Sequence, residues 1–236
     1  MNGTNGAADC TNYINKLANF GSNYSPGQLM ISARKGNYTN TNWYFDYAGD
    51  PIYQYGPYAT NAQYGVTNVN PTANVIGTSG TNQYGQGNFT AQATNVAGYY
   101  TGGWDGGTGQ HGTNDGYCFV DGSVRFFGQS GWYIMSTIDS YNGTRASTQA
   151  GFLTWFSTNS LGGTNYSNTP VGAVTTVDEP GLTGKPNSAA YYGDWAAGKS
   201  FAMAAWDAES QIPSGEGSFV SGGWYFQSVG DPFVKQ

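Results

Sequence analysis

The stretch GWYIMSTIDS, residues 131–140, marks the point at which the sequence takes up a regular α/β pattern. Its short apolar core is typical of a buried strand, and a helix-like segment follows over 148–160. A second strand is expected over 171–180, a helix over 196–210 and a last strand over 223–231. Strands that alternate with helices of about 10–15 residues predict a mostly parallel sheet covered by helices on both faces.

The first half of the sequence adds elements to the same sheet. A helix is expected from Asp9 onward, with Ile14, Leu17, Ala18 and Phe20 on its apolar face and Gly21 as its stop signal. Short strands are expected within 27–34, 74–79 and 96–103. No internal repeat or linker divides the chain. We therefore predict one α/β domain over residues 1–236, with three layers in the order α/β/α.

Residues 104–127 are expected to form a Gly-rich loop and a β-hairpin inserted into this domain. Asp121-Gly122 lies between two apolar runs, and an Asp-Gly pair suits the positive φ angles of a two-residue hairpin turn. Pairing outward from the turn places Cys118 and Arg125 on one face. The other face is apolar and is formed by Tyr117, Phe119, Val124 and Phe126.

The composition excludes some partners. Of the 236 residues, 9% are charged, 16% are aromatic and 37 are glycine, and the net charge is −6. Amides and hydroxyls, more than charged groups, must keep the protein in solution. A surface of that kind is commoner in proteins outside the cell than in the cytosol. So few cations argue against a nucleic-acid partner. No apolar run has the roughly 20 residues that a membrane span needs, and the start MNGTNGAADC is not a signal peptide.

His111 and Cys118, seven residues apart, are candidates for a catalytic pair. If Cys118 lies within a strand of the hairpin, its thiol need not meet the imidazole of His111, which lies in a Gly-rich loop. The favoured interpretation is therefore that Cys118 packs in the hairpin and that His111 is a loop residue without a catalytic role. A single histidine also gives no basis for a metal site. The Gly-rich segments lack the remainder of any phosphate-binding pattern, so no cofactor is expected.

The C-terminal part of the chain resembles a known fold family. The motifs are Gly172-Ala173-Val174 on a strand, Gly198 to Ala204 at a helix start, and Gly230-Asp231-Pro232 near the end. In this order they are similar to the caspase-like fold of gingipain-type cysteine peptidases, and more closely to uncharacterised secreted bacterial proteins with that fold. The resemblance covers roughly residues 95–236. It implies a further α/β segment upstream, so the chain is expected to be a fragment or a trimmed relative.

The same resemblance implies where catalytic residues would stand. The nucleophilic cysteine of those peptidases corresponds to Ser140, and their histidine corresponds to Gly102 or Gly103. An unassisted serine is a poor nucleophile at neutral pH. The chain is therefore expected to be non-catalytic, with residual hydrolysis by Ser140 and an unrecognised base as the alternative. His111 could reach Ser140 from its loop but is not the favoured base.

A second resemblance is limited to the hairpin. His111 followed after nine residues by Asp121-Gly122 is similar to the signature of a pilin-like family of planctomycete-type bacteria. It implies a surface subunit, but the apolar N-terminal helix of that family is missing here. The last hundred residues stay unexplained by it.

These observations predict a binding or structural domain of a bacterial extracellular or cell-envelope protein, with a glycan or a protein as its partner. Ser140, Asn142, Asp178 and Glu179 follow two strands of the expected parallel sheet. Carboxyl ends of parallel strands meet at one edge, so these residues are expected to converge. Their oxygens would suit a polar ligand or a hard cation, although Asp178 and Glu179 could equally cap neighbouring loops.

Overall fold

The computed structural model describes residues 6–20, 28–32, 75–78, 91–101, 124–137, 142–144, 152–177, 186–210 and 226–236. The strands are β1 (Gln28–Ser32), β2 (Val75–Thr78), β3 (Ala91–Thr94), β4 (Val96–Thr101), β5 (Val124–Phe127), β6 (Ile134–Thr137), β7 (Gly172–Thr176) and β8 (Phe226–Gly230). The helices are α1 (Gly6–Phe20), α3 (Phe152–Trp155), the 3-10 turn η2 (Ser160–Gly162), α4 (Ser188–Ala196) and α5 (Phe201–Ser210).

Six of the described strands form one sheet in the order β2-β1-β4-β6-β7-β8. Every pairing in it is parallel except the last, in which β8 runs antiparallel to β7. The strands expected within 27–34, 74–79, 96–103, 131–140, 171–180 and 223–231 are all present. The chain therefore has the α/β fold class that the sequence predicts.

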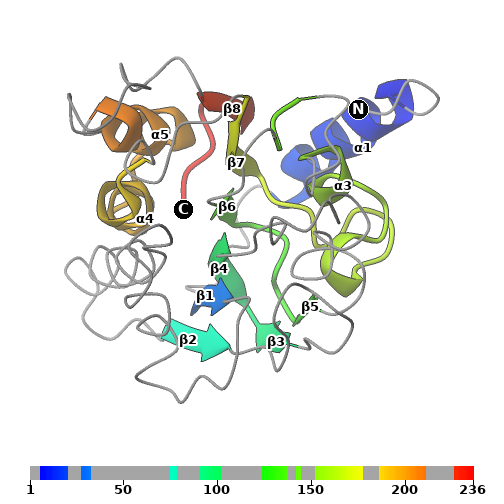
Figure 1. The fold of residues 1–236 in the computed structure, drawn as a ribbon. Coiled ribbons are helices and arrows are strands. Elements are labelled where there is room, and N and C mark those ends of the chain that lie inside the picture. The colour runs from blue at the N-terminus through cyan, green and yellow to red at the C-terminus, as the bar shows by residue number, and fades with distance from the viewer. Residues whose placement is uncertain are drawn as a thin grey trace, which may run out of the picture.

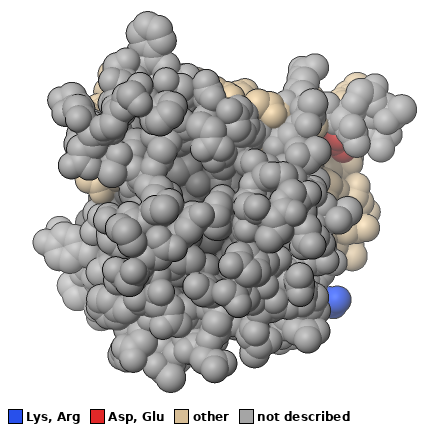
Figure 2. All heavy atoms as spheres, viewed as in Figure 1, with Lys and Arg blue, Asp and Glu red and all other residues tan. Residues whose placement is uncertain are grey.

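Helices lie on both sides of this sheet. Figure 1 shows α4 and α5 on one side and α1 and α3 on the other. The strand register places Ile134 beside Gly172, and a Cβ on Gly172 would lie 2.6 Å from the ring of Phe201 in α5. Gly172 thus lets α5 approach the sheet closely. Charged side chains are sparse among the described residues of the face shown in Figure 2.

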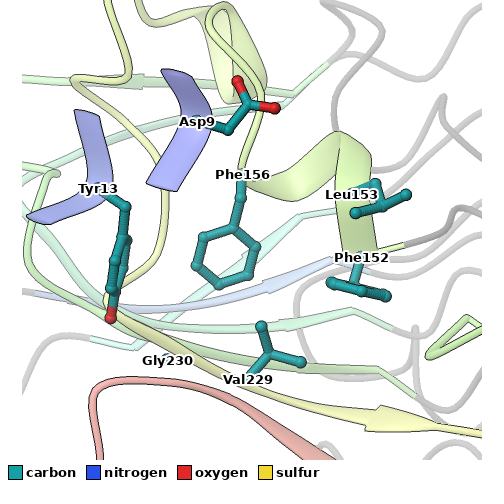
Figure 3. A pocket seen from close by; sticks show the side chains of 7 residues that line it. All are labelled: Asp9, Tyr13, Phe152, Leu153, Phe156, Val229 and Gly230. Atoms are coloured by element: carbon teal, nitrogen blue, oxygen red, sulfur yellow. The ribbon is translucent and has the colours of Figure 1, made fainter. Parts of the chain in front are cut away.

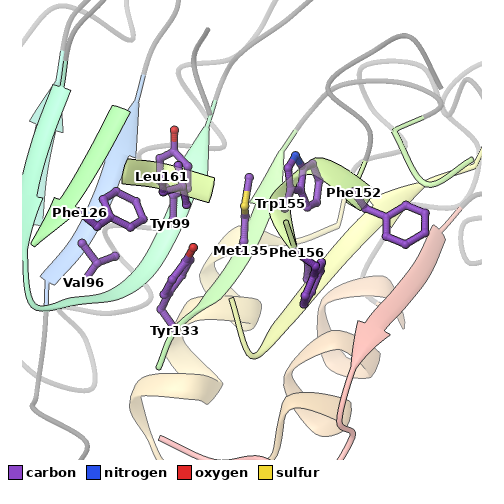
Figure 4. Close-up of a cluster of buried hydrophobic side chains, with 10 residues drawn as sticks. Val96, Tyr99, Phe126, Tyr133, Met135, Phe152, Trp155, Phe156 and Leu161 are labelled. Carbon is purple, nitrogen blue, oxygen red and sulfur yellow. The ribbon is translucent and has the colours of Figure 1, made fainter. Parts of the chain in front are cut away.

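An aromatic core fills the opposite side of the sheet (Figure 4). The rings of Tyr99 and Phe126 meet edge to face with centroids 5.2 Å apart, and Phe126 meets Tyr133 in the same way at 5.4 Å. Such pairs add to the stabilisation that burial provides. The buried members of this core are Val96, Tyr99, Phe126, Tyr133, Met135, Phe152, Trp155, Phe156, Leu161 and Ala173.

A second sheet of two strands, β3 and β5, continues from the first. The two strands are parallel, and Asn95, with φ +56°, turns the chain from β3 into β4. In β5, Phe126 is buried and Arg125 is exposed, as the predicted alternation requires. The expected partner strand of the hairpin, residues 117–120, and its turn lie outside the described residues, as does Cys118.

Two predicted helices differ from those observed. The helix expected over 148–160 has only the four residues of α3 among the described part of that range. Its continuation is rich in Ser, Thr and Asn, which favour turns over helix interiors. The helix expected over 196–210 is α5 alone, because Gly198 (φ +79°) ends α4 and donates its N–H to Trp195 O. Helix α4 itself was not predicted from the sequence.

Candidate functional site

The carboxyl edge of the sheet is where the sequence places its site. β4 and β6 are neighbours, and their last residues, Thr101 and Thr137, are directly paired. β6 and β7 are also parallel neighbours, so all three strands deliver their following loops to the same edge. The loop positions that the resemblance singles out therefore follow adjacent strands.

Asn142 joins two of these loops. Its side-chain Oδ1 accepts a hydrogen bond from Thr176 N at 2.7 Å, and Gly143 N donates to Thr176 O at 2.7 Å. The Asn142 carbonyl accepts Phe152 N at 2.8 Å, which fixes the start of α3. Residues 142–143 and the end of β7 are thus brought together.

The Asn142 side chain is completely buried, and its Nδ2 has no acceptor among the described residues. A buried amide N–H without a partner costs about 1–3 kcal/mol. The other predicted site residues lie outside the described part of the chain. They are Ser140, His111, Asp178 and Glu179, together with Gly102 and Gly103.

Helix α1 carries a polar anchoring face that the apolar pattern of its sequence did not reveal. Tyr13 OH donates to Val171 O at 2.6 Å and accepts Asp231 N at 2.7 Å, and burial raises the pKa of this phenol. Asp9, one turn earlier, accepts a 2.6 Å hydrogen bond from Tyr166 OH. Lys16, one turn later, donates to the carbonyl and hydroxyl oxygens of Thr169. Three side chains thus tie α1 to residues 166–171.

This geometry corrects the predicted orientation of α1. Ile14, expected on the buried face, is 62% exposed, whereas Lys16 is 6% exposed. Burial holds the pKa of the Lys16 ammonium well below its usual value. The spacing of Asp9, Tyr13 and Lys16 at i, i+4 and i+7 was the available signal, because these positions share one helix face. Cys10, on the same helix, is a free thiol.

A lysine bridges the two helices on the other side of the sheet. Lys199 Nζ lies 2.8 Å from Asp194 Oδ1 and 3.1 Å from Asp207 Oδ2. Burial raises the pKa of Asp194, while hydrogen bonds from Asp194 and Lys199 lower that of Asp207. The arrangement fixes the turn between α4 and α5. In the described part of the chain, no group of three or more His, Cys, Asp or Glu is placed to hold a metal ion.

The fold and the edge described above define an α/β protein with a mostly parallel sheet. Comparison with protein-family models, with curated proteins and with solved structures found no match. Among the described helices, none has the length and apolar character needed to cross a membrane.

Proposed function

We propose that this chain is a non-catalytic domain of a bacterial extracellular or cell-envelope protein, with the three-layer caspase-like fold, and that the carboxyl edge of its sheet binds a ligand. The observation that carries the proposal is the pairing of Thr101 with Thr137. In the sequence, Thr101 directly precedes Gly102 and Gly103, where the resembling peptidases have histidine, and Thr137 precedes Ser140 by three residues. The pairing therefore supports, at the level of the strands, a site shared by the two segments that follow them.

The strand order supports this assignment. If the strands β1, β2, β4, β6 and β7 are numbered 1 to 5 along the chain, they lie side by side in the order 2-1-3-4-5. The sheet therefore grows from its first strand toward both edges. Ligands of such sheets bind outside the carboxyl ends of the strands, near the point where the order reverses. Here that point lies between β1 and β4, next to β6.

The chemistry of the edge favours binding over hydrolysis. A glycine cannot take the proton of a nucleophile, and a serine without a base is weakly reactive at neutral pH. Asn142 is used in packing, since it holds Thr176 and α3. Asp178 and Glu179 would supply carboxylates to a hard cation or to the hydroxyls of a glycan.

Two experiments test the proposal. A fluorophosphonate probe should not label the folded protein above the level of a Ser140→Ala control; labelling that needs both Ser140 and the native fold would establish the hydrolase alternative. Calorimetric titration with Ca²⁺ and a glycan-array screen should show binding that Asp178→Asn with Glu179→Gln abolishes. Binding that survives this double substitution would place the ligand elsewhere on the protein.

The resemblance itself has a separate test. Gly102→His combined with Ser140→Cys should create measurable peptide hydrolysis if only the dyad is missing. Each single variant serves as the matched control, because neither restores the pair. A double variant that folds and remains inactive would argue against a peptidase ancestry for this edge.

A further inference from the structure

A pocket of about 160 Å³ lies between α1, α3 and the end of β8 (Figure 3). It is separate from the edge discussed above, and no sequence motif points to it. Its lining is aromatic and aliphatic apart from one carboxylate and a stretch of backbone. The lining residues are Asp9, Tyr13, Phe152, Leu153, Phe156, Val229 and Gly230.

The walls of the pocket are held in place by contacts outside it. Both hydrogen-bonding capacities of Tyr13 OH are used, by Val171 O and Asp231 N, so Tyr13 offers the pocket its ring. That ring meets Phe156 edge to face, with centroids 5.8 Å apart. Phe152 is buried, and its N–H is bonded to Asn142 O. A preformed pocket loses little conformational entropy when it takes up a ligand.

The volume sets the size of the occupant. An apolar protein cavity of about 150 Å³ binds benzene. The pocket therefore has room for one six-membered ring. Its aromatic walls favour a ring over an alkyl chain, because edge-to-face contacts add to the gain from burial.

Asp9 gives the pocket a charge preference. Its Oδ1 accepts a hydrogen bond from Tyr166 OH at 2.6 Å. Among the described residues that line the pocket, Asp9 alone is charged. An ammonium group attached to the bound ring would form a charge-assisted hydrogen bond with this carboxylate. The net charge of −6 of the chain also attracts cations.

We propose that this pocket binds a small aromatic amine, with its ring against Tyr13 and Phe156 and its ammonium group on the Asp9 carboxylate. The site does not depend on the carboxyl edge, so its success or failure is independent of the proposed function. The ligand class is an aryl ring joined to a protonated amine by a short alkyl arm.

The test compares 2-phenylethylamine with 2-phenylethanol, which has the same shape and no charge. Titration of the full chain is followed through the methyl NMR signals of Leu153 and Val229. We expect both signals to shift, and the amine to bind about tenfold more tightly, since hydrogen bonds to charged groups contribute about 1.5–3 kcal/mol. Unshifted methyl signals, or equal affinities for the two compounds, would overturn the proposal.

Two variants locate the binding. Asp9→Asn keeps an oxygen for Tyr166 OH, so it should fold, lower the amine affinity about tenfold and leave the alcohol unaffected. Asp207→Asn on α5, across the sheet, is the matched carboxylate control and should change neither affinity. Leu153→Trp should block both compounds by filling the pocket. If Asp9→Asn and Asp207→Asn have the same effect on the amine, long-range charge is responsible and the site is refuted.

Discussion

Lys16 and Thr169 are 153 residues apart in the sequence, yet Lys16 Nζ donates to both the carbonyl and the hydroxyl oxygen of Thr169. The lysine is buried, and Thr169 Oγ1 itself donates to Tyr166 O at 3.0 Å. The first helix is therefore docked on the C-terminal half of the chain by polar groups that are shielded from solvent. Such contacts are costly to break from one side, because a buried partner is left unsatisfied.

The lowered pKa of Lys16 predicts an unusual dependence of stability on pH. The unfolded chain binds a proton at Lys16 up to the ordinary lysine pKa of 10.5, whereas the folded chain releases it at lower pH. The free energy of unfolding should therefore rise with pH from the lowered pKa of the folded state up to about pH 10.5, and should be constant above that. Lys16→Met, which retains the length of the side chain, should remove this rise.

Urea unfolding at several pH values measures the effect as the difference between wild type and Lys16→Met. Lys235→Met is the matched control, because Lys235 is exposed. A difference between wild type and Lys16→Met that stays constant with pH would show that Lys16 keeps its proton in the folded protein.

Glu209 should change stability in the opposite direction. Burial raises its pKa to about 7, and its Oε1 is buried without a partner in the described structure. The folded state then holds a proton that the unfolded state releases above its ordinary pKa of 4.5. The free energy of unfolding should fall between pH 4.5 and about 7 and should be constant above that range.

Glu209→Gln should remove this loss. Because Glu209 is partly exposed, solvent screening limits the gain at pH 8 to about 1–2 kcal/mol relative to wild type. Near pH 4 the two proteins should be equally stable. Thermal unfolding at the two pH values provides the measurement, and a gain that is equal at both would exclude titration of Glu209 as its cause.

The sequence predicted the strands of the large sheet more successfully than the helices. Apolar runs such as those of β1, β6 and β7 are short and bounded by turn residues. This local pattern indicates a strand regardless of which elements pack against it. Helix α1 was predicted with the wrong buried face, because its contacts are polar and depend on Tyr166, Thr169 and Val171. Nothing local to α1 encodes those partners.

The candidate site, like the fold, was predictable from the sequence only where it depends on the arrangement of the strands. Parallel strands predict that the segments after β6 and β7 converge, and Asn142 is hydrogen-bonded to Thr176 at the end of β7. The convergence of Ser140 with Asp178 and Glu179 stays a prediction, because these residues lie outside the described part of the chain. The pocket beside Tyr13 was not predictable, since its walls come from three elements far apart in the sequence. A pocket of that kind depends on packing, which the sequence pattern does not specify.

Gly128 should be intolerant of any side chain. It has φ +65°, and a Cβ there would lie 2.4 Å from Asn95 Oδ1, which accepts Gln129 N. Gly198 is the matched control, because it has φ +79° and a Cβ there would have no atom within 4 Å. Gly198→Ala should cost about 1 kcal/mol from backbone strain, and Gly128→Ala about 2–4 kcal/mol from strain and collision together.

Asn95→Gly tests the source of the difference. It removes the side chain that collides and suits the positive φ of residue 95. Combined with Gly128→Ala, it should bring the cost of the alanine down to that of Gly198→Ala, as measured by chemical denaturation. If the alanine costs as much in the Asn95→Gly background, Asn95 is not the obstacle.

Asn142 offers a test of how the carboxyl edge is held. In Asn142→Asp, a carboxyl oxygen still accepts Thr176 N, but at pH 7 the substitution buries a charge that has no partner. We expect a loss of about 2 kcal/mol or more at pH 7 that is largely recovered at pH 4, where the new carboxyl group is neutral. Recovery is expected because Asn142 Nδ2 has no acceptor to lose among the described residues.

Asn168→Asp is the matched comparison within the core. Asn168 Nδ2 donates to Phe126 O at 2.8 Å and to Leu161 O at 3.1 Å, so its replacement by oxygen removes two donors. This variant should remain destabilised at pH 4. A protonated carboxyl group can donate only one hydrogen bond, whereas Asn168 Nδ2 donates to the carbonyl groups of both Phe126 and Leu161. Equal recovery of the two variants at pH 4 would mean that the Asn142 amide makes the same kind of contacts as the Asn168 amide, and that its Nδ2 is not a buried donor without a partner.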